Sequence, residues 1–284
     1  MKIPAYYGIW HHLGNWLLKV SSWLVLLFLI LPILVIVPLS FNAEPFFSFT
    51  EGMLTLDPDA YSLRWYREIL DDPKWILAIK NSFFIGILST ILATILGTCA
   101  AVGLARDEMP FRRFITALLL SPMIVPLIIT AAGMFFFYSN LGLAGGYLGV
   151  ILAHAALGTP FVIITVTATL TGFDYSLARA ALNLGATPIR VFFDVIMPLI
   201  RPGVISGALF AFITSFDEVV VILFMAGPQQ RTIPRQMFSG LREQINPSIL
   251  AIATLLILLS IALLVTLELL RRRAERMRGI EIPH

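Results

Sequence analysis

The chain has few charged residues and almost no cysteine, and both shortages exclude classes of protein. Charged residues make up 13% of the 284 residues, against roughly 25% in soluble domains. Cys99 is the only cysteine, so the sequence holds neither a disulfide framework nor a thiolate metal site. The four histidines are scattered and match no metal-ligand spacing. A Gly-x-x-x-x-Gly-Lys-Ser/Thr phosphate loop is also missing, so the chain cannot bind ATP by that route.

Long apolar runs are what the sequence does contain. Hydrophobic residues make up 58% of the chain, and runs of about 20 apolar residues, the length of a membrane span, recur along it. They predict an all-α membrane protein with six transmembrane helices, at 21–41, 81–105, 114–138, 147–171, 203–225 and 248–270. The first run is too long for a signal-peptide core, so we expect a retained helix. Prolines inside the runs, such as Pro122, Pro126 and Pro160, predict kinks that either shape a cavity or only vary the packing.

The segments outside the 21–270 bundle and the basic residues predict its orientation. Residues 1–20, with Trp10, Trp16 and Lys19, are typical of an interfacial segment, and residues 271–284 form a basic tail. Thirteen of the 20 lysines and arginines fall in these two segments and in the second-to-third and fourth-to-fifth connections, and seven fall elsewhere. Because cytoplasmic loops are enriched in basic residues, this bias predicts that both termini are cytoplasmic. Basic residues at the ends of the spans also account for the pI of about 9.2, so the pI does not require a nucleic-acid partner.

The stretch AFITSFDEVVVILF, residues 211–224, places Asp217 and Glu218 inside the fifth run. A charge at the bilayer centre costs at least about 2.5–3.5 kcal/mol, and such residues usually face a wet cavity or a partner. On a continuous helix the pair shares a polar face with Ser206, Phe210 and Thr214, and Asp217 lies about 12 Å inside the outer end. We therefore expect a path for a cationic solute, because carboxylates attract a cation and aromatic rings add cation–π contacts. Its candidate residues are Asp217, Glu218, Ser215, Thr214, Phe210, Phe216 and Trp65. The alternative is that a neighbouring helix, or a basic residue of a second subunit, satisfies the pair.

The connection between the fourth and fifth runs, residues 172–203, predicts two short helices. Ser176 is expected to cap a helix over 177–184 that ends at Gly185. Thr187 and Pro188 are typical of the cap and first residue of a second helix, over 188–195. Pro198, Pro202 and Gly203 are then expected to turn the chain back towards the membrane. Since the second helix is apolar on most of its surface, it should bury itself against another protein or against its own bundle.

Residues 179–198, RAALNLGATPIRVFFDVIMP, resemble the motif of binding-protein-dependent permeases: Glu-Ala-Ala, three residues, Gly, nine residues, then Ile-x-Leu-Pro. The matching residues are Ala180, Ala181, Gly185 and Pro198, with Val195 and Met197 as conservative variants, while Arg179 stands where the motif has glutamate. The stretches SLRWYREIL (62–70), KNSFFIGILST (80–90) and SFDEVVVILFMAGP (215–228) resemble the spermidine/putrescine branch of these ABC importers. The resemblance thus covers nearly the whole chain.

The resemblance implies a type I ABC importer permease fold with a cytoplasmic coupling helix, in the bacterial inner membrane. It implies a non-catalytic subunit that moves a polyamine such as putrescine or spermidine, or a related cationic or zwitterionic compound. The chain would need no cofactor, since ATP and magnesium would bind to a partner. Its partners would be a second permease subunit, two ATP-binding subunits, a periplasmic or lipid-anchored substrate-binding protein and membrane lipid. The ATPase-coupling candidates are Arg179, Ala180, Ala181, Gly185, Thr187, Pro188, Ile189, Arg190, Phe192, Phe193 and Pro198.

Two other functions fit parts of the sequence. A stand-alone channel or ion-coupled transporter could use Asp217 and Glu218, but an autonomous carrier needs no apolar cytoplasmic helix, and co-purification with an ATPase would discriminate. An intramembrane aspartyl protease needs two aspartates facing each other from different helices, whereas these carboxylates are neighbours.

Three arginines between the fifth and sixth runs oppose the charge bias. They are Arg231, Arg235 and Arg242. Either they contact an acidic binding protein or they are ordinary loop residues.

Overall fold

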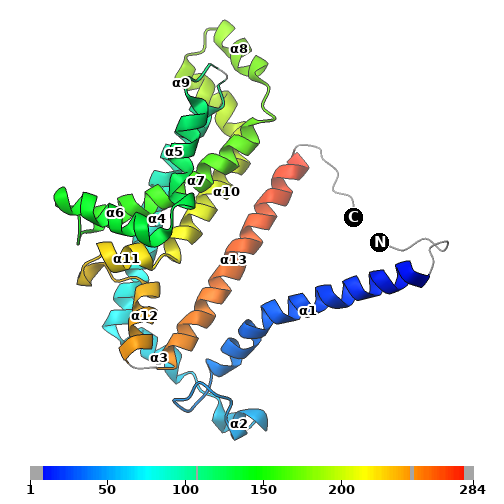
Figure 1. Cartoon of the computed structure of the whole chain (residues 1–284), viewed down its shortest axis with the longest axis vertical. Coiled ribbons are helices and arrows are strands. Elements are labelled where there is room, and N and C mark those ends of the chain that lie inside the picture. The colour runs from blue at the N-terminus through cyan, green and yellow to red at the C-terminus, as the bar shows by residue number, and fades with distance from the viewer. Residues whose placement is uncertain (1–8, 107, 244–245, 278–284) are drawn as a thin grey trace. The chain divides into compact units, whose positions relative to one another are not determined.

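The computed structural model describes residues 9–106, 108–243 and 246–277, and every regular element within these ranges is a helix (Figure 1). The chain divides into two compact units. Unit 1 contains the described residues up to Asp71 together with 246–260. Unit 2 contains Asp72–Glu243 and the described residues from Ile261 onward.

Unit 1 contains a long apolar helix near the N-terminus. It holds α1 (Ile9–Leu39), α2 (Glu51–Leu54), η1 (Pro58–Ala60), α3 (Arg64–Asp71) and the first part of α13 (Ser248–Met277). α1 runs without a break across the boundary expected at residue 20. Its apolar side chains are mostly exposed, as suits a helix whose solvent is lipid. α13 likewise continues past residue 270, into the segment expected to be a tail.

Unit 2 is a bundle around three long helices that pack together: α4, α7 and α10. Its elements are α4 (Pro73–Leu104), α5 (Arg112–Ile124), α6 (Leu127–Asn140), α7 (Tyr147–Leu170), α8 (Tyr175–Asn183), α9 (Pro188–Val191), η2 (Phe192–Ile196), α10 (Met197–Phe216), α11 (Val220–Met225), η3 (Pro228–Gln230) and α12 (Ile233–Glu243). Within this unit, α8 and α9 lie at one end of the bundle and α12 at the other (Figure 1).

Among the described residues, five helices are long and apolar enough to cross a membrane, or six if one bent pair is a single span. That pair is α5 and α6, which meet at 105° where one continuous span over 114–138 was expected. The break falls at Pro126, which has no backbone N–H, after Val125 in the extended conformation that a following proline favours. The expected kink is therefore much sharper than a bend within one helix.

The expected turn at Pro198, Pro202 and Gly203 is wrong, because the chain runs as one candidate span from Pro188 to Phe216. A π-helical segment, η2, precedes Pro198, and the Met197 N–H donates to the Phe192 carbonyl within it. Pro198 cannot donate a hydrogen bond, and its ring would clash with a carbonyl in regular α geometry. The wider turn of η2 lets the helix pass through the proline.

Small residues allow α4, α7 and α10 to approach closely, in layers spaced four residues apart. In one layer a Cβ atom on Gly158 would lie 3.0 Å from Ala211 Cβ and 3.4 Å from Ala93 Cβ. In the next layer, Val162 lies against both Gly97 and Gly207. Residue numbers rise together on α4 and α7 and fall on α10, so α10 is antiparallel to the other two helices. Without a hydrophobic driving force between helices in lipid, such close packing stabilises the bundle.

Gly207→Ala is expected to destabilise the bundle by about 1–3 kcal/mol, the usual cost of overpacking. The new Cβ would lie 2.8 Å from the backbone Cα of Val162, which cannot rotate away. Thermal unfolding of the purified protein in detergent should show a lower midpoint. Gly133→Ala in α6 is the matched control, because a Cβ there meets no described atom within 4 Å. Equal midpoints for both variants would contradict the packing argument.

Candidate functional site

The expected continuous helix over 203–225 is wrong, because α10 ends at Phe216 and α11 begins at Val220. The Asp217 N–H closes α10 by donating to the Ile213 carbonyl at 3.0 Å. Glu218 Oε1 accepts a hydrogen bond from the Val221 N–H at 2.9 Å. Glu218 thus satisfies one of the free donors at the start of α11. The two carboxylates therefore occupy a helix break inside the apolar run.

The break gives the two carboxylates different environments. Glu218 is only 7% exposed, and its carboxylate is engaged by the Val221 N–H at the start of α11. Asp217 is exposed, and on the same face of α10 Phe210 is 40% exposed and Thr214 is half-buried. The Phe210 ring stacks on Phe161 at a centroid distance of 6.2 Å. Of the expected polar face, Asp217 and Phe210 are exposed, Ser206 and Thr214 are half-buried, and Glu218 is buried.

Ser215 and Phe216 are buried beside this face. The Ser215 hydroxyl lies 2.9 Å from Ser89 Oγ and 2.8 Å from His154 Nδ1. The Phe216 ring packs against Phe83 and Phe212, at centroid distances of 5.2 and 5.3 Å. This aromatic cluster adjoins Asp217 along the chain, and no sequence argument singled out Phe83, which stands in an apolar run with no local signal.

Trp65 belongs to unit 1 and is buried there. Its indole N–H donates to the Asn42 carbonyl at 2.7 Å. The Arg64 guanidinium lies over the ring, 4.0 Å from the centroid. Trp65 thus offers no accessible ring face to a solute in this conformation.

The connection over 172–203 carries α8 and the caps that shape it. The cap of α8 is Asp174 rather than the expected Ser176, because Asp174 Oδ1 accepts from the Ser176 N–H at 2.8 Å. Hydrogen bonds from Ser176, through its side chain and its backbone, lower the pKa of Asp174. Gly185 ends the helix as expected, with φ at +86°. The Gly185 and Ala186 N–H groups donate to Leu182 and Ala181, the pattern of a Schellman cap.

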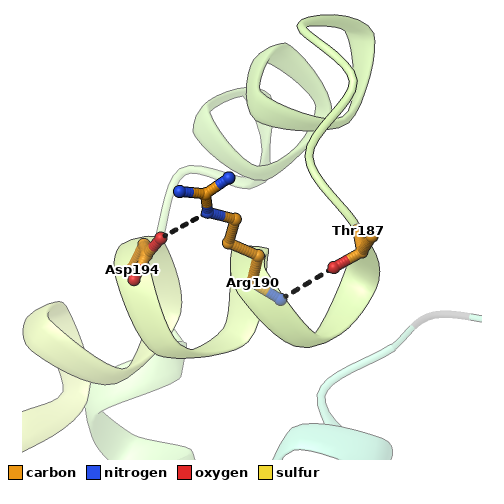
Figure 2. A network of polar contacts seen from close by, with 3 residues as sticks. All are labelled: Thr187, Arg190 and Asp194. Atoms are coloured by element: carbon orange, nitrogen blue, oxygen red, sulfur yellow. Dashed lines mark hydrogen bonds and ion pairs between the residues drawn. The ribbon is translucent and has the colours of Figure 1, made fainter.

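α9 begins as its sequence indicates. Thr187 Oγ1 accepts from the Arg190 N–H at 3.4 Å, and Pro188 is the first helical residue (Figure 2). One turn further on, Arg190 Nε lies 3.4 Å from Asp194 Oδ2 (Figure 2). Both side chains are largely exposed, so this pair contributes little to stability.

The same segment exposes large apolar side chains at the end of unit 2. Ile189 is 73% exposed and Phe193 is 60% exposed, whereas Val191 is buried. A groove of about 350 Å³ runs between the end of α8 and η2. The other coupling candidates are exposed, except for the half-buried Ala181 and Phe192: Arg179, Ala180, Gly185, Thr187, Pro188, Arg190 and Pro198. The exposed apolar side chains are therefore not packed under the bundle of unit 2.

At the opposite end of unit 2, the segment before α12 is tied to α4. Asn81 Nδ2 donates to the Gln229 and Arg231 carbonyls at 2.7 and 2.9 Å, and Ser82 Oγ accepts from the Ile233 N–H at 2.8 Å. Arg235 donates to the Ala226 and Gly227 carbonyls, and burial lowers its pKa.

The arginines in this region mostly make contacts within the chain. Arg231 donates to Gln236 at 2.8 Å, and Arg235 is engaged as described above. Arg242 lies over the Phe238 ring at 5.8 Å and is exposed. Intrachain contacts therefore account for Arg231 and Arg235 without an acidic partner.

Comparisons with known proteins agree with this architecture. Residues 97–276 match the family described as binding-protein-dependent transport system inner membrane component. The chain is 35% identical to the putrescine transport system permease protein PotI of Escherichia coli K12, over 81% of this chain and 82% of that protein. It is 31% identical to the spermidine/putrescine transport system permease protein PotC of Haemophilus influenzae, over 87% of this chain and 93% of that protein.

Two solved structures share the fold. A bacterial ABC transporter involved in the import of the acidic polysaccharide alginate aligns with a TM-score of 0.72 at 16% identity, covering 93% of this chain and 99% of that one. A bacterial alginate ABC transporter in complex with an alginate pentasaccharide-bound periplasmic protein aligns with a TM-score of 0.63 at 15% identity, covering 96% of this chain and 99% of that one. The family is a transport component of the inner membrane and not an enzyme. The chain belongs to the binding-protein-dependent transport system inner membrane component family and is an ABC importer permease subunit.

Proposed function

We propose that this permease imports an organic cation of the polyamine class, driven by ATP that a partner hydrolyses. The observation that carries the proposal is Asp217, an exposed carboxylate at a helix break inside an apolar run. Glu218 is engaged by α11, so Asp217 is the carboxylate left to meet a solute. A diamine would offset its charge in the membrane, and the neighbouring Phe210 adds an accessible ring. The names of the polyamine permeases that the chain resembles support the same class.

The exposed surface of α8, α9 and η2 supports coupling to a separate ATPase. Burial of its apolar side chains against another protein would be stabilising. The chain itself carries no phosphate loop. The proposed assembly contains a second permease subunit, two ATP-binding subunits that hold ATP and magnesium, and an external substrate-binding protein. Both termini and the 172–203 connection are on the cytoplasmic side in this proposal. A stand-alone channel is disfavoured, because it would leave that surface uncovered.

Solute-stimulated ATP hydrolysis tests the proposal. In lipid vesicles, the complex of this permease with its partners should hydrolyse ATP several-fold above its basal rate when its binding protein and putrescine or spermidine are added. A neutral diol and a dicarboxylate of similar length should give only the basal rate, because neither carries a positive charge for Asp217. Equal stimulation by the neutral compound would contradict the cationic class. Import without any ATPase would contradict the coupling.

A further inference from the structure

A buried polar cluster joins the three central helices of unit 2 next to the helix break between α10 and α11. It consists of Ser89 on α4, His154 on α7 and Ser215 on α10, all nearly inaccessible. Ser215 Oγ lies 2.9 Å from Ser89 Oγ and 2.8 Å from His154 Nδ1. These are the spacings of good hydrogen bonds. A polar group in an apolar bundle is costly unless it is paired, so this cluster holds its three helices in one register.

The hydrogen-bond partners fix the order of the donors. Ser89 Oγ donates to the Ile85 carbonyl of its own helix. Its oxygen therefore accepts from the Ser215 hydroxyl, whose single proton is then used. Ser215 in turn accepts from His154 Nδ1–H. This order satisfies every contact in the cluster, and it leaves His154 Nε2 as a bare nitrogen with no partner among the described residues.

The cluster lies one residue before the end of α10, next to Phe216, whose ring packs against Phe83 of α4. One turn before Ser215, Ala211 packs against Gly158. One residue after Ser215 α10 ends, and the next residue is Asp217. Beyond it, the start of α11 is fixed by Glu218. The place where the Asp217 carboxylate leaves the bundle thus depends on how Ser215 is held.

We infer that His154 is a positioning residue for Asp217: through Ser215 it sets the end of α10 and so the position of the carboxylate that meets the solute. The inference rests on the proposed role of Asp217. A histidine that merely filled space would be replaced by leucine with little effect on solute affinity, because well-packed apolar groups substitute for buried polar ones. A histidine that positions Asp217 cannot be replaced in this way, since leucine removes the tie from Ser215 to α7, leaves only its hydrogen bond to Ser89 of α4, and so shifts the helix end.

Half-saturating concentrations for putrescine uptake by the full complex test the inference. His154→Leu is expected to raise this concentration about tenfold, with a smaller change in the maximal rate per assembled complex. His154→Asn should restore most of the affinity, because its side-chain N–H₂ can occupy the place of Nδ1–H and donate to Ser215. Thr159→Val on the same helix is the control, since that hydroxyl donates only to Ala155 of α7 itself. An equal shift in the control, or no rescue by asparagine, would overturn the inference.

A double variant separates positioning from a general loss of function. If His154 acts through Asp217, His154→Leu should change the half-saturating concentration less than about twofold in an Asp217→Asn background. Full multiplication of the two effects would overturn the inference and leave the role of Asp217 intact. No effect of Asp217→Asn alone would instead refute the proposed function. Should His154→Leu fail to assemble, Ser215→Ala provides the same test, and a Ser215→Ala complex with unchanged affinity would overturn the inference.

Discussion

Asp217→Asn is expected to lower putrescine or spermidine uptake by about tenfold or more. The substitution keeps the size of the side chain and removes the charge that attracts an ammonium group. Charge-assisted contacts are worth roughly 1.5–3 kcal/mol, and each 1.4 kcal/mol corresponds to about a tenfold change in binding. Because Asp217 is exposed and closes α10 only through its backbone N–H, the bundle should assemble normally. Uptake by vesicles or cells, normalised to the amount of assembled complex, measures the effect.

Glu218→Gln is the matched control for this prediction. It neutralises the neighbouring carboxylate, yet the glutamine side-chain oxygen can still accept from the Val221 N–H that Glu218 engages. Because Glu218 is buried and caps α11, we expect uptake to fall less than about threefold, the scale of a weakened cap. Equal losses in the two variants would mean that the carboxylates act as a pair. Normal uptake by Asp217→Asn would remove the proposed role of this residue.

The different environments of Asp217 and Glu218 could not be predicted from the sequence. A helical wheel assumes an unbroken helix, and no proline or glycine between Phe216 and Val220 signals a break. The break is visible only in the folded chain, where Ser215 is held by two other helices and Glu218 turns back to cap α11. A wheel places both carboxylates in one polar arc with their side chains about 100° apart, so it allows that only one faces the solute but does not say which. In the structure Asp217 is exposed and Glu218 is buried.

Where a helix start or end depends on neighbouring residues, the sequence was sufficient to predict it. Thr187 and Pro188 start α9, and Gly185 ends α8 with a positive φ, because each of these residue types fits a conformation fixed by its immediate neighbours. Asp174 was overlooked as a cap because α8 begins at Tyr175, two residues before the start expected at residue 177. The π-helical passage through Pro198 was also missed, since proline was taken to end a helix that in fact widens.

His154 illustrates a third limit. In the sequence it is one of four scattered histidines, and nothing near it along the chain is polar enough to suggest a partner. Its partners, Ser89 and Ser215, are brought to it by α4 and α10. A four-residue spacing of small side chains was present on α4 and α10, as in Ser89, Ala93 and Gly97. That pattern predicts close packing, but only the structure shows which layers meet.

Replacing Ile189 and Phe193 together by serine is expected to abolish coupling. Both side chains are largely exposed in this chain, and burying each against a partner is worth about 1.5–3 kcal/mol. Loss of both should weaken ATPase binding by more than about a hundredfold. Co-purification of the ATP-binding subunits and solute-stimulated hydrolysis should both fall to background. Neither residue packs in the bundle core, so the permease itself should remain assembled with an unchanged unfolding midpoint.

Phe111→Ser separates docking from a general effect of removing an exposed aromatic ring. Phe111 is also highly exposed, and it lies between α4 and α5, outside the 172–203 connection. The charge bias of the sequence predicts that Phe111, beside Arg112 and Arg113, lies on the same side of the membrane as that connection. It should leave co-purification and hydrolysis unchanged if α9 and η2 form the docking surface. If Phe111→Ser uncoupled the complex as strongly, or if the Ile189/Phe193 variant still hydrolysed ATP in response to solute, this surface would not be where the work of ATP hydrolysis enters the permease.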